Sequence, residues 1–288
     1  MLEYGYMAQS LLSWGAFLLY TTACFVAVSY LINKSERARL AMLSLLGTGL
    51  VLHLFAWAAR LVAFWAIPEN RWFLPVNSFF GALSYMALAL AAAFFFIEAR
   101  KKLGILGAFI LPFVAGGLGL AVLKASPAVS PLEPDLRSYW LNLHPMILMT
   151  AYAFFANAFG VCLALLIQER QIKSRKPSEL CYRLPSLDEL DSLNGRIVAL
   201  TLPVLVIGLA MGMIWAHQIW GKPWTWDPKE TMALITAAFY AEFLWLRYWA
   251  GQRGRTPVYV SMAGFACMLL TFFGAELASG RHGYLGGK

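Results

Sequence analysis

Residues 215–230 read WAHQIWGKPWTWDPKE, and apolar runs long enough to cross a membrane flank them on both sides. The stretch is therefore expected to be a short connection between two membrane helices. It contains four tryptophans, which are Trp215, Trp220, Trp224 and Trp226. Tryptophan favours the membrane–water interface, where its ring is buried and its N–H stays hydrated, and this role would account for one or two of them.

Four tryptophans in so short a run, with Gly221 allowing close approach of the backbone, predict a flat aromatic shelf at the bilayer surface. Such a shelf suits a large planar ligand with an apolar body and charged edges, and haem is the candidate. A shelf alone does not hold a metal, so this hypothesis requires axial ligands elsewhere in the chain.

The composition is that of an integral membrane protein. Of the 288 residues, 60% are hydrophobic and only 13% are charged, whereas a soluble domain of this size would carry about 25% charged residues. The net charge of +8 is interpreted as an excess of basic residues on one side of the membrane, and no nucleic-acid partner is expected. The four cysteines form no C-x-x-C pair, so reduction of any substrate disulfide is assigned to a separate thiol-reducing partner.

The hydropathy pattern predicts an all-α polytopic membrane helix bundle of about eight transmembrane helices, which forms a single membrane domain over residues 1–288. The first apolar run lacks a basic leader and a cleavage site, so we expect it to be retained as a helix. The expected spans are 9–32, 41–67, 76–97, 103–123, 146–168, 196–218, 230–250 and 257–276.

The loops on one side carry most of the Lys and Arg residues, which assigns that side to the cytoplasm. These basic segments lie around residues 34–39, 100–102, 170–196 and 247–255. Both termini and the loop 215–230 are then expected on the external, periplasmic side of a plasma (inner) or thylakoid-type membrane. The long cytoplasmic segment 169–195 mixes both charges and is expected to be a solvated linker with a short amphipathic helix.

Two of the four histidines are expected on the same side as the tryptophans. His144 begins the fifth span and His282 follows the eighth. Because they lie at the ends of different helices, a bundle could place them on opposite faces of one ligand, as bis-imidazole ligation of haem iron requires. Either one alone would be interpreted as an ordinary interface histidine, but the pair, beside four tryptophans, favours axial ligation.

The pattern W-G-x-x-W-x-W-D-P-K-E, from Trp220 to Glu230, resembles the tryptophan-rich signature (WWD domain) of the haem-handling membrane proteins of cytochrome c maturation. The ending Asp-Pro-Lys-Glu is similar to that of the CcsA/ResC type of the system II pathway. The resemblance implies an external haem b ligated by His144 and by His282, which lies in the family's G-x-H-x-Y setting. The cofactor-binding residues expected from the loop and its surroundings are Trp215, Trp220, Gly221, Trp224, Trp226, Asp227 and Arg60.

The same resemblance implies a membrane subunit that presents haem for covalent attachment to an apocytochrome c with a CxxCH motif, as part of a cytochrome c haem lyase. A ResB/CcsB-like membrane subunit is the implied partner, because the large external domain of fused versions is missing. Asp227 with Pro228 also reads as an ordinary helix N-cap, so its role has a structural alternative.

His53 lies in the middle of the second span, where a polar ring is costly and usually functional. It is interpreted either as an axial ligand of a second haem within the membrane or as a helix–helix hydrogen-bonding residue. Arg60 lies about two turns further on the same face and could pair with a haem propionate or extend to the interface. The family's internal-haem members carry another histidine where this chain has Trp245, so that ligand pair is incomplete. His217 is interpreted as a residue of the shelf, or as a group that supports a ligand without touching the metal, rather than as an axial ligand.

Two other functions fit parts of the pattern. A regulatory or scaffold membrane protein of the HemX type would share the eight spans without transferring haem, and the missing internal histidine favours it weakly. A small-molecule transporter would show an inverted repeat and broken helices, and the sequence has no convincing repeat.

Overall fold

The computed structural model describes residues 2–174 and 176–274, and this part of the chain is helical with no strand. The α-helices are α1 (Leu2–Asn33), α2 (Glu36–Trp65), α3 (Phe79–Lys101), α4 (Gly107–Lys124), α5 (Tyr139–Lys173), α6 (Glu179–Arg183), α7 (Leu187–Trp220), α8 (Pro228–Tyr248) and α9 (Arg255–Leu269). Short 3-10 turns are η1 (Pro68–Asn70), η2 (Gly104–Leu106) and η3 (Pro134–Leu136), and a π-helical turn, η4 (Leu270–Gly274), continues α9.

Seven of the described helices are long and apolar enough to cross a membrane. They are α1, α2, α3, α4, α5, α7, and α9 together with η4. The remaining expected span, 230–250, forms α8, which has 21 residues and is therefore long enough to cross the hydrocarbon. Its charged residues make its mean hydropathy too low for it to be included among these seven helices. The prediction of an all-α polytopic membrane bundle is confirmed, and the chain is an integral multi-pass membrane protein.

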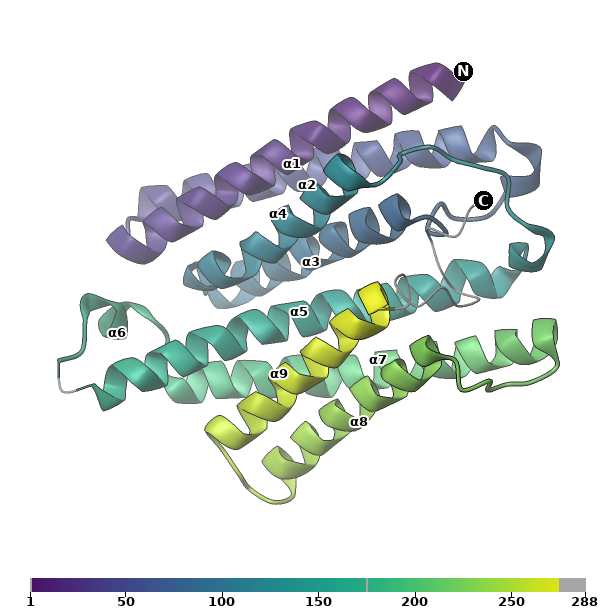
Figure 1. Cartoon of the computed structure of the whole chain (residues 1–288). Coiled ribbons are helices and arrows are strands. Elements are labelled where there is room, and N and C mark those ends of the chain that lie inside the picture. The colour runs from purple at the N-terminus through teal and green to yellow at the C-terminus, as the bar shows by residue number, and fades with distance from the viewer. Residues whose placement is uncertain (1, 175, 275–288) are drawn as a thin grey trace.

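Successive long helices run in opposite directions, so the connections gather at two ends of the bundle (Figure 1). We call one end the tryptophan end, because it carries the loop 221–227 together with the loops 66–78 and 125–138. The opposite end, which we call the basic end, carries the turns after α1, α3 and α8 and the short helix α6. The basic loops therefore share one end, as the sequence predicted, while the side of the membrane that each end faces stays a prediction.

The helix α5 holds the two halves of the bundle together. It packs against α3 and α4 on one side and against α7 and α9 on the other. The pair α1 and α2 packs against α4 and α3, while α8 packs against α7, and α9 packs against α5 and α8 (Figure 1). Each half is thus anchored on one long central helix, and the N-terminal turns of that helix reach the tryptophan end.

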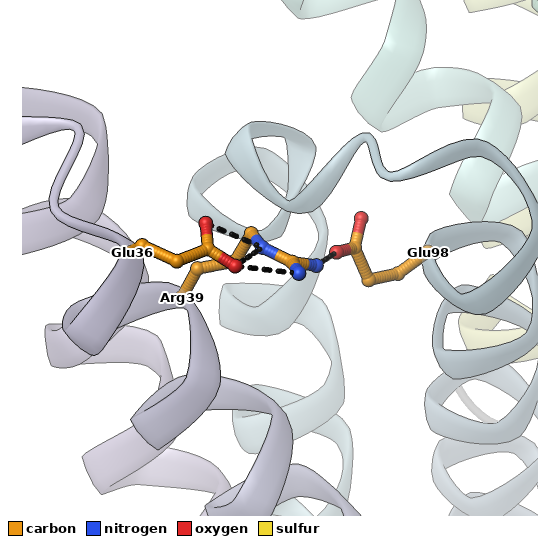
Figure 2. A network of polar contacts seen from close by, with 3 residues as sticks. All are labelled: Glu36, Arg39 and Glu98. Carbon is orange, nitrogen blue, oxygen red and sulfur yellow. Dashed lines mark hydrogen bonds and ion pairs between the residues drawn. The ribbon is translucent and has the colours of Figure 1, made fainter.

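An ion-pair network ties α2 to α3 at the basic end (Figure 2). The Nε atom of Arg39 donates to both carboxylate oxygens of Glu36 at 2.9 and 3.0 Å, and its Nη1 atom pairs with Glu98. The side chain of Glu98 is fully buried, whereas that of Glu36 is 64% exposed. A buried carboxylate without its counter-charge is strongly unfavourable, so the Arg39–Glu98 pair fixes the two helices at this end.

We expect Arg39→Met to lower the free energy of unfolding by about 3 kcal/mol, because it leaves the Glu98 carboxylate buried without a counter-charge. Thermal or denaturant unfolding in detergent micelles, followed by circular dichroism, measures this loss. Glu36→Gln is the matched control, since it removes the exposed arm of the same network and should cost much less. Equal losses of unfolding free energy in the two variants would contradict the role of the Arg39–Glu98 pair in fixing the two helices.

Candidate functional site

The loop between α7 and α8 has a defined conformation at both of its ends. Gly221 ends α7 in the left-handed region at φ 71°, and its N–H donates to the carbonyl of His217 at 2.9 Å. Asp227 begins α8 by accepting a hydrogen bond from the backbone N–H of Lys229 at 2.9 Å, with Pro228 at the first helical position. The predicted N-cap is therefore confirmed, and the glycine provides the backbone turn that other residues would resist.

Glu230 closes the loop from the α8 side. Its carboxylate accepts hydrogen bonds from the backbone N–H of Thr225 at 2.8 Å and from the Thr225 hydroxyl at 3.2 Å. These bonds join the middle of the loop to the first turn of α8. The positions of the neighbouring tryptophans are consequently set by a hydrogen-bonded loop rather than by a free segment.

The four tryptophans form two perpendicular pairs and not the flat shelf that the sequence predicted. The rings of Trp215 and Trp220 lie 5.1 Å apart at 66°, and those of Trp224 and Trp226 lie 5.9 Å apart at 87°. Trp226 is 74% exposed and has a left-handed backbone at φ 59°.

The other three tryptophans wall a pocket at the tryptophan end of the bundle. Its lining comes from α5, α7, the loop, α8 and η4, and consists of His144, Leu148, Tyr152, Leu209, Gly212, Met213, Trp215, Ala216, Trp220, Pro223, Trp224, Lys229, Glu230, Ala233 and Thr271. The cavity measures about 90 Å³, which is below the roughly 300–1,000 Å³ of small-molecule sites. A ligand of haem size would therefore rest against the pocket with part of its surface outside it.

His144 is held in a single orientation between α5 and α7. Its Nδ1 atom lies 2.8 Å from the carbonyl oxygen of Gly208, so Nδ1 carries the proton that is donated to this acceptor. The lone pair of the imidazole is then on Nε2, which is the form that ligates a metal. The ring packs directly over Gly212, where a Cβ atom would lie only 2.5 Å from Cε1 of His144.

The remaining polar groups of the pocket also suit a ligand with charged edges. Trp224 lines the pocket, and its buried Nε1–H has no hydrogen-bond partner among the residues that the structure describes. Lys229 lines the same pocket, whereas Lys222 does not. An apolar interior, an oriented imidazole, an indole donor and a lysine are together compatible with haem and its propionates.

The positions of His282 and His217 bear differently on the roles predicted for them. His282 lies outside the described residues, so its place opposite His144 stays a prediction. His217 is exposed on α7 and does not line the pocket, so the structure does not place it beside the pocket tryptophans, and its exclusion as an axial ligand stays a prediction.

His53 is fully buried among α1, α2 and α3, away from the tryptophan pocket. Its Nε2 atom lies 2.9 Å from the hydroxyl of Ser84 and its Nδ1 atom lies 3.4 Å from that of Tyr20. The Ser84 hydroxyl also accepts a hydrogen bond from the indole of Trp57 at 3.1 Å. Both ring nitrogens thus face partners on neighbouring helices, which is the helix–helix alternative that the sequence left open.

Arg60 is buried at the tryptophan end and binds protein groups that are all uncharged. It donates to the carbonyls of Pro75 at 3.2 Å and Pro127 at 2.9 Å, and to the hydroxyl of Ser78 at 2.7 Å. These acceptors belong to the loop before α3, the loop after α4 and the N-cap of α3. Arg60 does not line the tryptophan pocket, so its expected role toward a propionate stays a prediction, while its contacts fix the two loops.

Several residues of the pocket escaped the sequence analysis. Tyr152 on α5 and Thr271 on η4 carried no signal, because the rotation of one helix against another is not written in a single sequence. Gly208 and Gly212 did carry one, since they form a G-x-x-x-G pattern, which marks close helix–helix contact in membranes.

Known proteins resemble the chain in both sequence and structure. It is 29% identical over 259 residues to the cytochrome c biogenesis protein CcsA of Porphyra purpurea, covering 75% of this chain and 81% of that protein. It is also 29% identical over 293 residues to the protein of the same name from Thermosynechococcus vestitus, covering 88% of each. Among solved structures, the cytochrome c haem lyase CcmF shares its fold with a TM-score of 0.73 at 16% identity. That alignment covers 93% of this chain and 46% of CcmF, so the chain spans about half of that protein.

The family model described as cytochrome C assembly protein matches residues 76–282. The matched region contains every residue that lines the tryptophan pocket. Since it also covers well over half of the sequence, this membrane protein belongs to the family of cytochrome c assembly proteins.

Proposed function

We propose that the chain binds haem b against the tryptophan pocket and presents it at the external membrane surface for covalent attachment to an apocytochrome c. The observation that carries the proposal is the orientation of His144, whose Nδ1 bond to Gly208 directs ligation to Nε2 in an apolar pocket. The names of the relatives, CcsA and the cytochrome c haem lyase CcmF, support the same assignment.

Each part of the pocket has a defined task in this function. Nε2 of His144 holds the iron from one side, and we assign the other side to His282. The Gly208 carbonyl keeps the imidazole in the ligating tautomer, in the way that outer hydrogen bonds orient metal-binding histidines. The indoles of Trp215, Trp220 and Trp224 cover the apolar face of the ring system and exclude water from it.

The covalent chemistry belongs to haem and to the substrate. Haem supplies two vinyl groups, and each S–H group of the substrate's CxxCH motif adds across one of them. The chain contributes position, because the pocket leaves part of a haem-sized ligand outside the protein. The substrate histidine then replaces one of the chain's two imidazoles on the iron, which releases the product. A ResB/CcsB-like membrane subunit and a thiol-reducing partner complete the system II machinery.

The purified protein should show the absorption spectrum of low-spin, bis-histidine haem, and both His144→Ala and His282→Ala should disturb it, because each removes one axial ligand. His217→Ala is the control, since this exposed histidine does not line the pocket. Cytochrome c maturation in cells should fail with the two ligand variants and continue with the control. A wild-type protein without haem, and maturation that does not depend on His144, would instead favour the regulatory HemX-type function.

Gly212→Ala should weaken haem binding by about 10–100-fold, the usual effect of changing a group that orients a metal ligand. The new methyl group would lie 2.5 Å from Cε1 of His144, so the imidazole has to move. Haem titration with a spectroscopic readout measures the change. Gly47→Ala is the matched control on α2, because its added atom meets Phe95 at an ordinary 3.5 Å. Equal haem affinity in the two variants would contradict the role of Gly212.

His53→Ala distinguishes the two roles of His53. If the residue only joins helices, the variant should lose about 1 kcal/mol of stability, as interhelical hydrogen bonds in membranes do, and keep the haem-to-protein ratio. Ser84→Ala should then behave in the same way, because it removes the partner of Nε2. A lower haem-to-protein ratio in His53→Ala alone would support a second, internal haem.

A further inference from the structure

An apolar slot lies between the two halves of the bundle. It lies between α3 and α4 on one side and α9 with η4 on the other, and α5 forms its floor at Ala156. The lining residues are Leu83, Met86, Ala87, Leu90, Pro112, Phe113, Gly116, Gly117, Leu120, Ala156, Phe265, Met268, Leu269 and Phe273. None of these side chains is polar, and the slot has a volume of about 220 Å³.

Two aromatic clusters close the ends of the slot. Phe113 of α4, Phe159 of α5 and Phe265 of α9 form the first, with ring centroids 4.3–6.0 Å apart. Phe79 of α3 packs at 6.2 Å from Phe272 and 6.4 Å from Phe273 in the second. The two halves of the bundle therefore contact each other through the two aromatic clusters. The slot between these clusters is not filled by side chains of the described residues.

The surroundings of the slot determine the kind of occupant. Its walls belong to helices that are apolar and long enough to cross a membrane, so it opens onto the hydrocarbon of the bilayer. A dry apolar cavity of about 150 Å³ already takes up benzene, and this slot offers no polar partner to water. A single turn of a second protein helix, about 10 Å wide and 5.4 Å long, occupies more than the slot's volume of about 220 Å³.

A positive charge lies directly above the slot. Gly116, Leu120 and Lys124 follow one another at intervals of four residues, so they share one face of α4. Lys124 is exposed, ends the membrane-spanning part of α4, and lies about 6 Å beyond Leu120 along the helix axis. This is the depth at which the phosphate of a lipid meets the protein surface.

We propose that the slot binds one acyl chain of a phospholipid from the leaflet at the tryptophan end, with the lipid phosphate paired to Lys124. The bound chain fills the space between the aromatic clusters and supports the wall that the slot shares with the tryptophan pocket. Thr271 lines that pocket and Phe273 lines the slot, both on η4, and Tyr152 and Ala156 do the same on α5. The lipid site stands on this geometry and does not depend on haem binding.

The test is native mass spectrometry of the full-length protein after extraction from vesicles of dioleoyl-phosphatidylethanolamine and dioleoyl-phosphatidylglycerol, with and without an added isoprenoid quinone. We expect wild type to retain one phospholipid. Gly116→Phe should retain it at least about tenfold less, because the side chain displaces several methylene groups of the acyl chain. A Cβ at Gly116 meets nothing within 4 Å, so the ring has room in the slot. Lys124→Gln should also weaken retention.

Leu18→Phe is the matched control, because it adds an aromatic ring to the outward face of α1 without reaching the slot. Gly116→Leu provides a second, smaller filling variant and should reduce retention in the same direction. Unchanged phospholipid retention in the folded filling variants overturns the proposal. Retention of the quinone instead of a phospholipid, insensitive to Lys124→Gln, overturns it as well.

Discussion

The functional site depends on the close approach of α5 and α7. Gly208 and Gly212 lie one turn apart on α7, and Cβ atoms there would come within 2.6 Å of Leu148 and 2.5 Å of His144. Because glycine has no Cβ atom, the Gly208 carbonyl can lie 2.8 Å from Nδ1 of the His144 imidazole. Burial of apolar surface does little to bring helices together in lipid, so small residues and interhelical hydrogen bonds carry that task. The packing of α5 against α7 therefore also sets the orientation of the His144 imidazole.

Hydropathy predicted the architecture well because it reports directly on the bilayer. All eight expected spans correspond to helices, with α8 the most polar of them. The ends were less predictable, since helices continue past the hydrocarbon into polar segments that hydropathy does not mark as helical. Thus α5 has 35 residues and α7 has 34, and both extend into the segment expected to be a linker. The short helix expected in that segment is α6.

The site was predictable in its residues but not in its shape. The tryptophan run and His144 pointed to one end of the bundle, and the structure brings three of the four tryptophans together with that histidine. A walled pocket forms instead of the expected shelf, because the rings of Trp215 and Trp220 pack edge to face and the bonds between Thr225 and Glu230 fix the loop. Residues such as Tyr152 enter the pocket through the rotation of α5, which depends on contacts between helices far apart in sequence.

The two halves of the bundle differ in how they hold His53 and His144, although both halves contain buried polar atoms without a hydrogen-bond partner among the described residues, such as Gln9 Nε2 and Trp224 Nε1. In the α1–α3 half, His53 contacts Ser84 and Tyr20, while Arg60 binds backbone carbonyls and a hydroxyl of the outer loops. In the α5–α8 half, the hydrogen bond of His144 uses Nδ1, and Trp224 keeps a buried donor without an acceptor in the described chain. The family match begins at residue 76, after His53 and Arg60, and includes the whole pocket. We therefore expect the first two helices to act as a brace, and the oriented imidazole of α5 to be the group that the bundle positions for a ligand.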